Sequence, residues 1–216
     1  MAKPKDPGLR LRLIEAASAE FAEKGFGASN LSDIGERADV TKGGVYFHFR
    51  GKEELFFASV DHWREAHREV LQASPEDEPA TLRSFLVAYL EFHFRHPEVS
   101  GLMRVLSSEM RDRFTTRVRE DQQASLRATR LRIRELLMEG THDGSLFTTD
   151  PAMATFVLSA AVEGILSLVH SAGRDTDPFR HPESLADFLL VPYETSSEGG
   201  TGQTTEPDGV DFLPPV

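Results

Sequence analysis

The chain of 216 residues contains no cysteine, which excludes disulfide bonds, thiolate metal sites and a thiol nucleophile. It also lacks a nucleophile elbow, a Gly-rich phosphate loop and an HExxH pair of histidines. No alternating strand pattern and no internal repeat appears along the sequence. These absences predict an all-α protein that is not an enzyme and that holds no cofactor.

A signal peptide and a membrane-spanning helix are also not expected. Residues 1–8 have no apolar core of the kind that a secretory signal needs. The longest apolar run, residues 152–169, is interrupted by four polar side chains, which are Thr155, Ser159, Glu163 and Ser167. The sequence therefore predicts a cytoplasmic protein.

Positive charge is scarce, because the net charge is −11, yet its distribution is uneven. Residues 1–52 carry 9 Lys and Arg against 7 Asp and Glu, whereas residues 53–193 carry 15 against 23. Residues 194–216 carry 5 acidic residues and no basic ones, and their composition predicts a disordered tail. A small DNA-binding head on an acidic body would have this distribution.

Residues 30–49 have the pattern of two short helices joined by a tight turn. Apolar residues recur at helical spacing after Asn30, which can cap the free amides of the first helix. The corner at residues 38–40 interrupts this pattern, and Thr41 is placed to cap a second helix over residues 42–49.

The second helix begins with two glycines, Gly43 and Gly44, each of which weakens a helix by about 1 kcal/mol relative to alanine. A helix end that must approach a DNA groove closely benefits from glycine, because side chains would hold the backbone away. Val45 and Phe49 lie four residues apart and are expected to face inward. The outer side is then formed by Lys42, Gly43, Gly44, Tyr46 and His48.

The run at residues 41–49, together with Lys-Glu-Glu-Leu at residues 52–55, resembles the DNA-binding domain of TetR-type bacterial regulators over about residues 8–60. The resemblance implies a three-helix head that binds operator DNA as a dimer and a helical body whose effector releases the DNA. Departures from the family pattern are Gly35, Asp39 and Gly44. The implied DNA-contacting residues are Thr41, Lys42, Gly43, Gly44, Tyr46, His48 and Lys52.

About nine helices are expected, and they divide into four parts. These parts are an arm with a helix-turn-helix domain at residues 1–51, a connecting helix at 52–73, a ligand-binding and dimerisation domain at 74–193, and an acidic tail at 194–216. The last two helices, with their small residues, are expected to form a homodimer interface. Lys52, at the start of the connecting helix, is expected to hold a DNA phosphate.

The body is rich in aromatic and methionine side chains, and methionine is common at adaptable binding surfaces. A plain hydrophobic core is one interpretation, whereas the family resemblance implies a pocket for a small apolar or amphipathic effector. The predicted lining residues are Phe85, Tyr89, Phe92, His93, Met103, Phe156 and Glu163.

The competing hypothesis is a helical small-molecule or metal-binding protein, possibly an enzyme, whose helix-turn-helix is vestigial. His93 and His96 are three residues apart, and further metal ligands could come from His62, His67, Glu91, Glu163 and His170. No tight ligand motif accompanies them, so no metal site is predicted.

Overall fold

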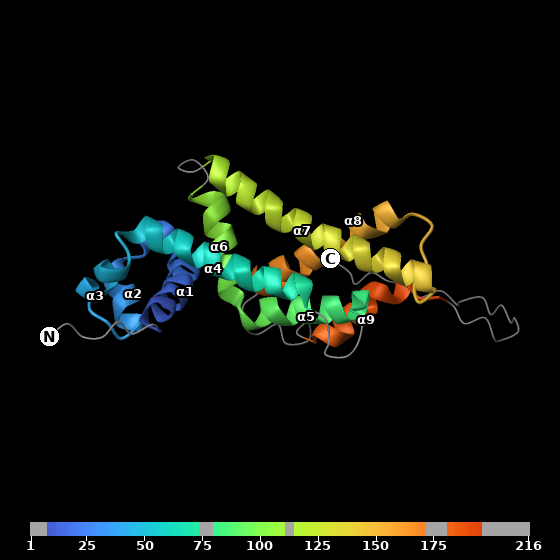
Figure 1. Ribbon diagram of the computed structural model, residues 1–216, viewed down its shortest axis with the longest axis horizontal. Coiled ribbons are helices and arrows are strands. Elements are labelled where there is room, and N and C mark those ends of the chain that lie inside the picture. Colours follow the sequence, from blue (N-terminus) through green and yellow to red (C-terminus); the bar gives the residue numbers. More distant parts are fainter. Residues whose placement is uncertain (1–7, 74–79, 111–114, 172–180, 196–216) are drawn as a thin grey trace, which may run out of the picture.

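The computed structural model describes residues 8–73, 80–110, 115–171 and 181–195 (Figure 1). The arm before residue 8 and most of the acidic tail, on which the sequence made predictions, lie outside these residues. The described chain is helical, and its one β-contact is an isolated bridge between Leu146 and Glu194.

Nine α-helices and one short 3-10 helix make up the described residues, as the sequence predicted. They are α1 (Leu9–Ala28), α2 (Leu31–Arg37), α3 (Lys42–His48), α4 (Lys52–Gln72), α5 (Leu82–Arg95), α6 (Pro97–Ser108), α7 (Thr115–Asp143), α8 (Pro151–Ser171), α9 (Pro182–Leu190) and η2 (Val191–Tyr193). Figure 1 shows α1, α2 and α3 at one end of an elongated molecule, with α4 leading away from them.

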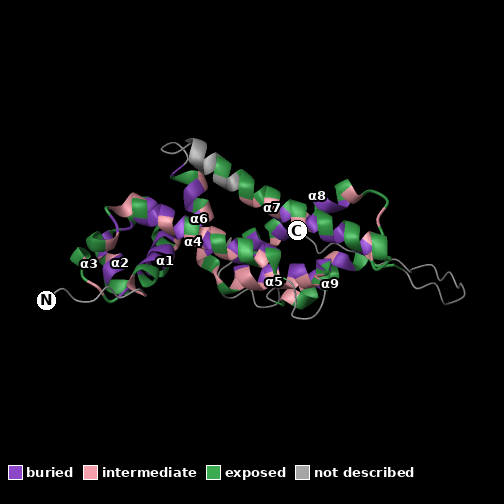
Figure 2. Ribbon diagram, viewed as in Figure 1, coloured by how far each residue is buried: buried purple, intermediate pink, exposed green. Residues whose placement is uncertain are grey.

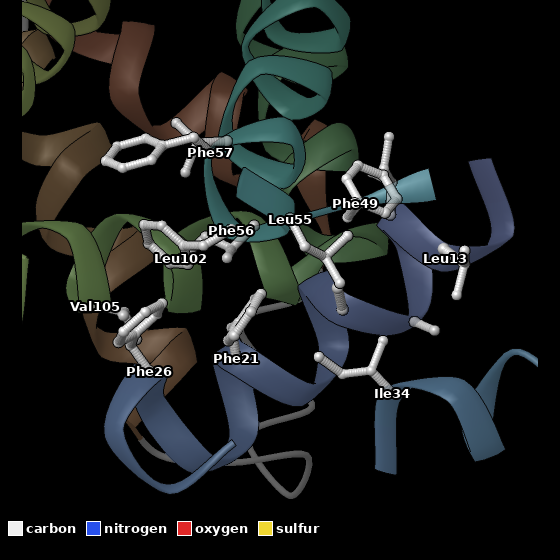
Figure 3. Packing of buried hydrophobic residues seen from close by; sticks show 14 of the residues in the cluster. Leu13, Phe21, Phe26, Ile34, Phe49, Leu55, Phe56, Phe57, Leu102 and Val105 are labelled. Atoms are coloured by element: carbon white, nitrogen blue, oxygen red, sulfur yellow. The ribbon is translucent and has the colours of Figure 1, made fainter. Parts of the chain in front are cut away.

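The hydrophobic interior consists of two clusters of buried side chains. The first combines the head with α6, because Leu102 and Val105 of α6 pack with Phe21 of α1 and Phe56 of α4 (Figure 3). The second joins α5, α7, α8, α9 and the end of α4. α6 therefore belongs to the core of the head, whereas the expected division at residue 74 had placed it with the body.

The contact between α1 and α6 is unusually close. A Cβ atom placed on Gly101 would lie 2.4 Å from the Cβ of Ala22, so only glycine allows the two helices to meet here. Nearby, Arg104 donates a hydrogen bond to the Ala22 carbonyl at 2.9 Å, and the Glu109 carboxylate accepts one from the Gly27 amide at 2.8 Å. The head is thus fastened to the body by α6 as well as by α4.

Glycines with positive φ lie near the C-terminal ends of two long helices, α1 and α7. α1 is interrupted at Gly25, whose φ is +80°, and Phe26 folds back so that its ring stacks on that of Phe21 with the ring centres 5.8 Å apart. The helical hydrogen bonding then continues to Ala28. α7 is longer than expected, because Gly140 lies inside the helix and Gly144, with φ +82°, follows its last residue.

α8 begins where predicted, with the Asp150 carboxylate accepting hydrogen bonds from the Ala152 and Met153 amides at 3.1 and 3.0 Å. Its segment Pro151–Val169 has a mean hydropathy of 1.9, and by length and composition alone it could cross a membrane. The core helix of a soluble protein has the same composition. Here α8 packs against α7 and contributes Leu158 and Val162 to the second cluster.

Candidate nucleic-acid interface and effector cavity

The helix-turn-helix forms from local signals at its two caps and its corner. The Asn30 side chain accepts hydrogen bonds from the Ser32 and Asp33 amides, both at 3.0 Å. The Thr41 hydroxyl accepts one from the Gly44 amide at 3.3 Å. Between the helices, Asp39 adopts a left-handed conformation with φ +58°, which aspartate tolerates better than most residues. The predicted turn is therefore present without the family's usual glycine.

The predicted inner and outer sides of α3 are confirmed. Val45 and Phe49 are 0% and 1% exposed, which anchors the helix on the head. Lys42 and Gly43 are exposed, Gly44 and His48 are half-buried, and Tyr46 is 51% exposed. These residues form one outward surface, and Figure 2 shows α3 at the end of the molecule.

Phe47 belongs to the same surface, although it was not among the predicted contacts. It is 70% exposed, compared with 51% for Tyr46, and its ring packs edge-on against His48 at 5.2 Å. An exposed apolar ring on this surface is suited to contact a thymine methyl group in a DNA groove. The signal was present in the sequence, because a helix that buries positions 45 and 49 must turn position 47 outward.

The three glycines of this motif have different roles. A Cβ on Gly43 would meet only the Thr41 hydroxyl at 3.8 Å, so packing inside the protein does not require glycine there. A Cβ on Gly35 would lie 2.8 Å from the Val40 carbonyl oxygen, so the corner can close only over glycine. Gly44 has more room than Gly35, with its nearest neighbour at 3.4 Å. Gly35 therefore serves the fold, whereas Gly43 leaves the outer surface open.

Lys52, one of the expected phosphate contacts, makes its hydrogen bonds inside the head. Its ammonium donates to the carbonyls of Phe26, Gly27 and Ser29 at 2.5, 3.3 and 2.7 Å, and it lies 4.6 Å from the centre of the Phe26 ring. An ammonium has three donors, and all three are used here. Lys52 thus satisfies carbonyls that the kink in α1 leaves without helical partners, and its expected DNA contact stays a prediction.

A cavity of about 1050 Å³ lies between the two hydrophobic clusters. Its walls come from six helices, α1, α4, α5, α6, α7 and α8. Four of the predicted lining residues are found there, namely Tyr89, His93, Met103 and Glu163. The volume is large enough for a drug-sized molecule.

Three predicted lining residues lie elsewhere. Phe85 is 3% exposed and packs in the second cluster, where its ring is 5.6 Å from Tyr89. Phe92 fills the space between Trp63 and His96 behind the cavity wall, with ring separations of 6.3 and 5.2 Å. Phe156 is 57% exposed on α8.

The sequence reasoning missed the contribution of α4 and α1 to the wall. Trp63 and His67 of α4 line the cavity, and so do Ala19, Ala22 and Glu23 of α1. Trp63 and His67 are four residues apart, a spacing that puts them on one side of α4, but this spacing gives no indication that the side faces a cavity. Because α1 belongs to the head, a molecule in the cavity would touch both parts of the protein.

A chain of polar side chains crosses the cavity wall. The Tyr89 hydroxyl lies 3.4 Å from His67 Nε2 and 3.5 Å from the Thr129 hydroxyl. Burial lowers the pKa of His67 to about 4, so its imidazole is neutral at physiological pH. Burial, and secondarily the nearby Glu163 carboxylate, raise the pKa of Tyr89, which therefore stays a hydroxyl donor.

Glu163 lies at the open edge of the cavity. Its side chain reaches solvent, yet the surrounding apolar groups remove enough water to raise the pKa of its carboxyl. It forms no hydrogen bond or ion pair with the described part of the chain. A carboxylate in this position is suited to receive a donor or a positive group from a bound molecule.

The histidines do not assemble a metal site among the described residues, where no group of three potential metal-ligating side chains occurs. His67 and His93 have ring centres 5.8 Å apart, and His96 pairs with Glu98 at 3.2 Å. The side chain of His170 lies outside the described residues.

Comparison with known protein families gives matches to both parts of the chain. A family model described as bacterial regulatory proteins, tetR family, matches residues 13–59. A second model, described as the C-terminal domain of AefR-like transcriptional repressors, matches residues 80–182. The two matches include α2, α3 and most of the helices that line the cavity.

Among individual proteins, a probable acrEF/envCD operon repressor of Escherichia coli (strain K12) is 29% identical over 192 residues, or 84% of each chain. The transcriptional regulator TtgR of Pseudomonas putida is 39% identical over 69 residues, which cover 32% of this chain and 33% of TtgR. The structure of SmeT with triclosan has a TM-score of 0.63 at 25% identity and covers 94% of this chain and 99% of SmeT. SmeT is described as the repressor of a multidrug efflux pump of Stenotrophomonas maltophilia.

Proposed function

Because the chain belongs to the TetR family of bacterial transcriptional regulators, we propose that it is a cytoplasmic repressor whose α3 surface holds operator DNA until an effector binds. The observation that carries this proposal is the complete helix-turn-helix with an exposed, glycine-opened α3. A vestigial motif would not need to keep Lys42, Tyr46 and Phe47 on one outer surface. The competing hypothesis of a ligand-binding protein without DNA is therefore not favoured.

The operator contacts are assigned to the outer surface of α3. Lys42 makes a phosphate contact, while Tyr46 and His48 lie beside the backbone and Phe47 faces the groove. Thr41 and the backbone of Gly43 and Gly44 make the closest approach, because no Cβ intervenes at the two glycines.

Repressors of this family act as dimers, and we assign the interface to α8 and α9. α8 exposes an unusual number of apolar side chains, which are Met153, Phe156, Val157 and Leu168. Phe188 of α9 is 79% exposed, and a side chain on Gly164 would meet nothing within 4 Å. Burying these surfaces against a second copy would place two α3 helices for half-sites about 34–36 Å apart.

The effector is assigned to the cavity, and its chemistry follows from the wall. Every other charged side chain on the wall has a partner; these pairs are Glu23 with Arg37, Arg64 with Asp61, Glu98 with His96, and Arg104 with the Ala22 carbonyl. Among the charged side chains that the structure describes on the wall, Glu163 is the one without such a pair, and it is available as an anchor together with the Tyr89 hydroxyl. We therefore infer an amphipathic effector with an apolar body and a donor or positive group at its Glu163 end. The complex of SmeT with triclosan supports a small-molecule ligand for this fold.

The effector would act on the head because α1 forms part of the cavity wall. α6 also lines the cavity, and it packs against α1 with no room for a side chain at Gly101. A molecule that pushes α6 must therefore move α1 as well. By linkage, operator DNA and effector must weaken each other's binding by the same factor, and a 100-fold factor corresponds to about 2.7 kcal/mol.

The test is fluorescence anisotropy with labelled DNA from the region upstream of the gene that encodes this chain. We expect tight binding that K42A and Y46A weaken, with unfolding temperatures nearly unchanged. For K42A the slope of binding against salt falls by about one unit, because one phosphate contact is lost. R95A, an exposed change on α5, serves as the control. Unchanged binding by both α3 variants would contradict the assignment of α3.

A further inference from the structure

One exposed side of α7 combines three arginines with two apolar side chains. Leu131 and Met138 are 55% and 47% exposed, although large apolar residues on a helix are normally turned inward. Arg127, Arg130 and Arg134 are exposed beside them. Spacings of three, four and seven residues place all five on one side of the helix, here called the α7 stripe.

No ion pair joins the arginines of the α7 stripe to a side chain that the structure describes. The ion pair on α7 is formed by Arg132 and Glu135 at 3.5 Å, and Arg132 lies to the side of the stripe. On α4 and α5, by contrast, the exposed residues Arg68, Arg83 and Arg95 each pair with a carboxylate. Three adjacent arginines without a partner among the described side chains are unusual in a chain whose net charge is −11. Figure 1 shows α7 along the outside of the molecule.

The C-terminal segment, residues 196–216, has the complementary composition. It contains four acidic residues, which are Glu198, Glu206, Asp208 and Asp211, and no lysine or arginine. Three large apolar residues, Val210, Phe212 and Leu213, stand next to the last of these acids. The segment thus pairs carboxylates with apolar groups, as the α7 stripe pairs guanidinium groups with Leu131 and Met138.

The residues that precede this segment lie next to the C-terminal end of α7, so the segment begins there. The Phe147 amide donates to the Tyr193 carbonyl at 2.7 Å, and Glu194 bridges to Leu146, just after the last turn of α7. From Met138 back to Arg127 the stripe is about 16 Å long at 1.5 Å per residue. A segment of 21 residues can extend up to about 70 Å, so it can return along the whole stripe.

We propose that residues 196–216 bind the α7 stripe of the same chain, with their carboxylates on Arg127, Arg130 and Arg134 and Phe212 over Leu131 and Met138. A tether of this length gives an effective concentration in the millimolar range, so even a weak contact is populated. The bound segment covers the basic stripe and keeps it from binding polyanions such as DNA non-specifically. DNA binding is then confined to α3.

Because the chain has no cysteine, two cysteines can be introduced as labelling sites in the full-length protein. We place one at Gly209 in the segment and one at Glu139, which is exposed beside the stripe on α7. Energy transfer between a donor and an acceptor dye is then measured against salt. We expect high transfer in dilute buffer and a large decrease in about 1 M salt, where the Debye length is about 3 Å.

Charge reversal separates this surface from general attraction. R127E/R130E/R134E should lower transfer in dilute buffer to the high-salt value. R68E/R83E/R95E changes the net charge equally at other exposed positions and should leave transfer largely intact. Equal transfer in the wild type and the stripe variant would overturn the proposal.

Two further outcomes would also overturn it. Transfer between singly labelled G209C and singly labelled E139C chains mixed together would show that the segment crosses to a partner. The covering role is tested by E198Q/E206Q/D208N/D211N, which leaves the basic stripe intact but uncovered and should bind random DNA more tightly; unchanged non-specific binding by this variant would remove the covering role. Both readouts are independent of operator release, so failure of the repressor assignment would be seen separately.

Discussion

At the scale of single residues, Lys52 shows how a position typical of a DNA contact can serve the fold. The ammonium is held by three carbonyl oxygens at the end of α1, on a loop that precedes the helix-turn-helix. Lys42, only ten positions earlier, is exposed and makes none of these contacts. Lys52 therefore contributes to the fold, whereas Lys42 is available for binding DNA.

We predict opposite effects for K52A and K42A. K52A leaves the carbonyls of Phe26, Gly27 and Ser29 without their donor and should lower the free energy of unfolding by about 1–3 kcal/mol. K42A should leave it unchanged within about 0.5 kcal/mol, because exposed substitutions are usually tolerated. Urea denaturation followed by circular dichroism measures both. Equal stability of the two variants would contradict the structural role of Lys52.

The glycines Gly35 and Gly43 provide a second matched pair. G35A should destabilise the head by about 1–3 kcal/mol, since its Cβ would meet the Val40 carbonyl oxygen at 2.8 Å. G43A should instead leave stability equal or slightly higher, because alanine favours the helix by about 1 kcal/mol. In anisotropy titrations G43A should nevertheless bind operator more weakly. A stable G35A protein would show that the corner can relax.

At the scale of helices, the sequence predicted the elements well because their signals are local. Asn30, Thr41 and Asp150 form their caps within three residues, so the spacing alone identified them. The lining of the cavity could not be predicted in this way. Phe85 and Trp63 both lie on apolar stripes, and which stripe faces a void depends on how α6 packs against α1 and α4.

The exposed apolar face of α8 leads to a prediction about assembly. G164R introduces a long charged side chain at a position that has nothing within 4 Å in the single chain. The variant should therefore fold normally but should not dimerise, and its operator affinity should fall steeply. Sedimentation velocity at micromolar concentration distinguishes the two states. A dimeric G164R protein, or a monomeric wild type, would contradict the assigned interface.

At the scale of the whole molecule, the buried imidazole of His67 links stability to pH. Its pKa is about 4 in the folded chain and 6.5 when unfolded, so only the unfolded chain takes up a proton between these values. The stabilising effect is complete above pH 6.5 and is lost as the pH falls toward 4. The total loss is at most about 3 kcal/mol.

H67Q should remove this part of the pH dependence. Comparing urea denaturation at neutral and acidic pH, we expect the difference between the two conditions to be smaller in H67Q than in the wild type. H142Q, which changes an exposed histidine at the end of α7, should behave like the wild type. Identical pH profiles for H67Q and the wild type would contradict the neutral, buried imidazole.

The cavity between the two clusters has a consequence for the amount of repressor in the cell. An effector that fills about 1050 Å³ stabilises the folded chain by about 2.7 kcal/mol at 100 times its dissociation constant. Less of the chain is then unfolded and available to proteases. We expect pulse-chase measurements to show a longer half-life when effector is present. The effector that releases the operator would thus also maintain the amount of repressor in the cell. Repression would then resume once the effector is gone, without synthesis of new repressor.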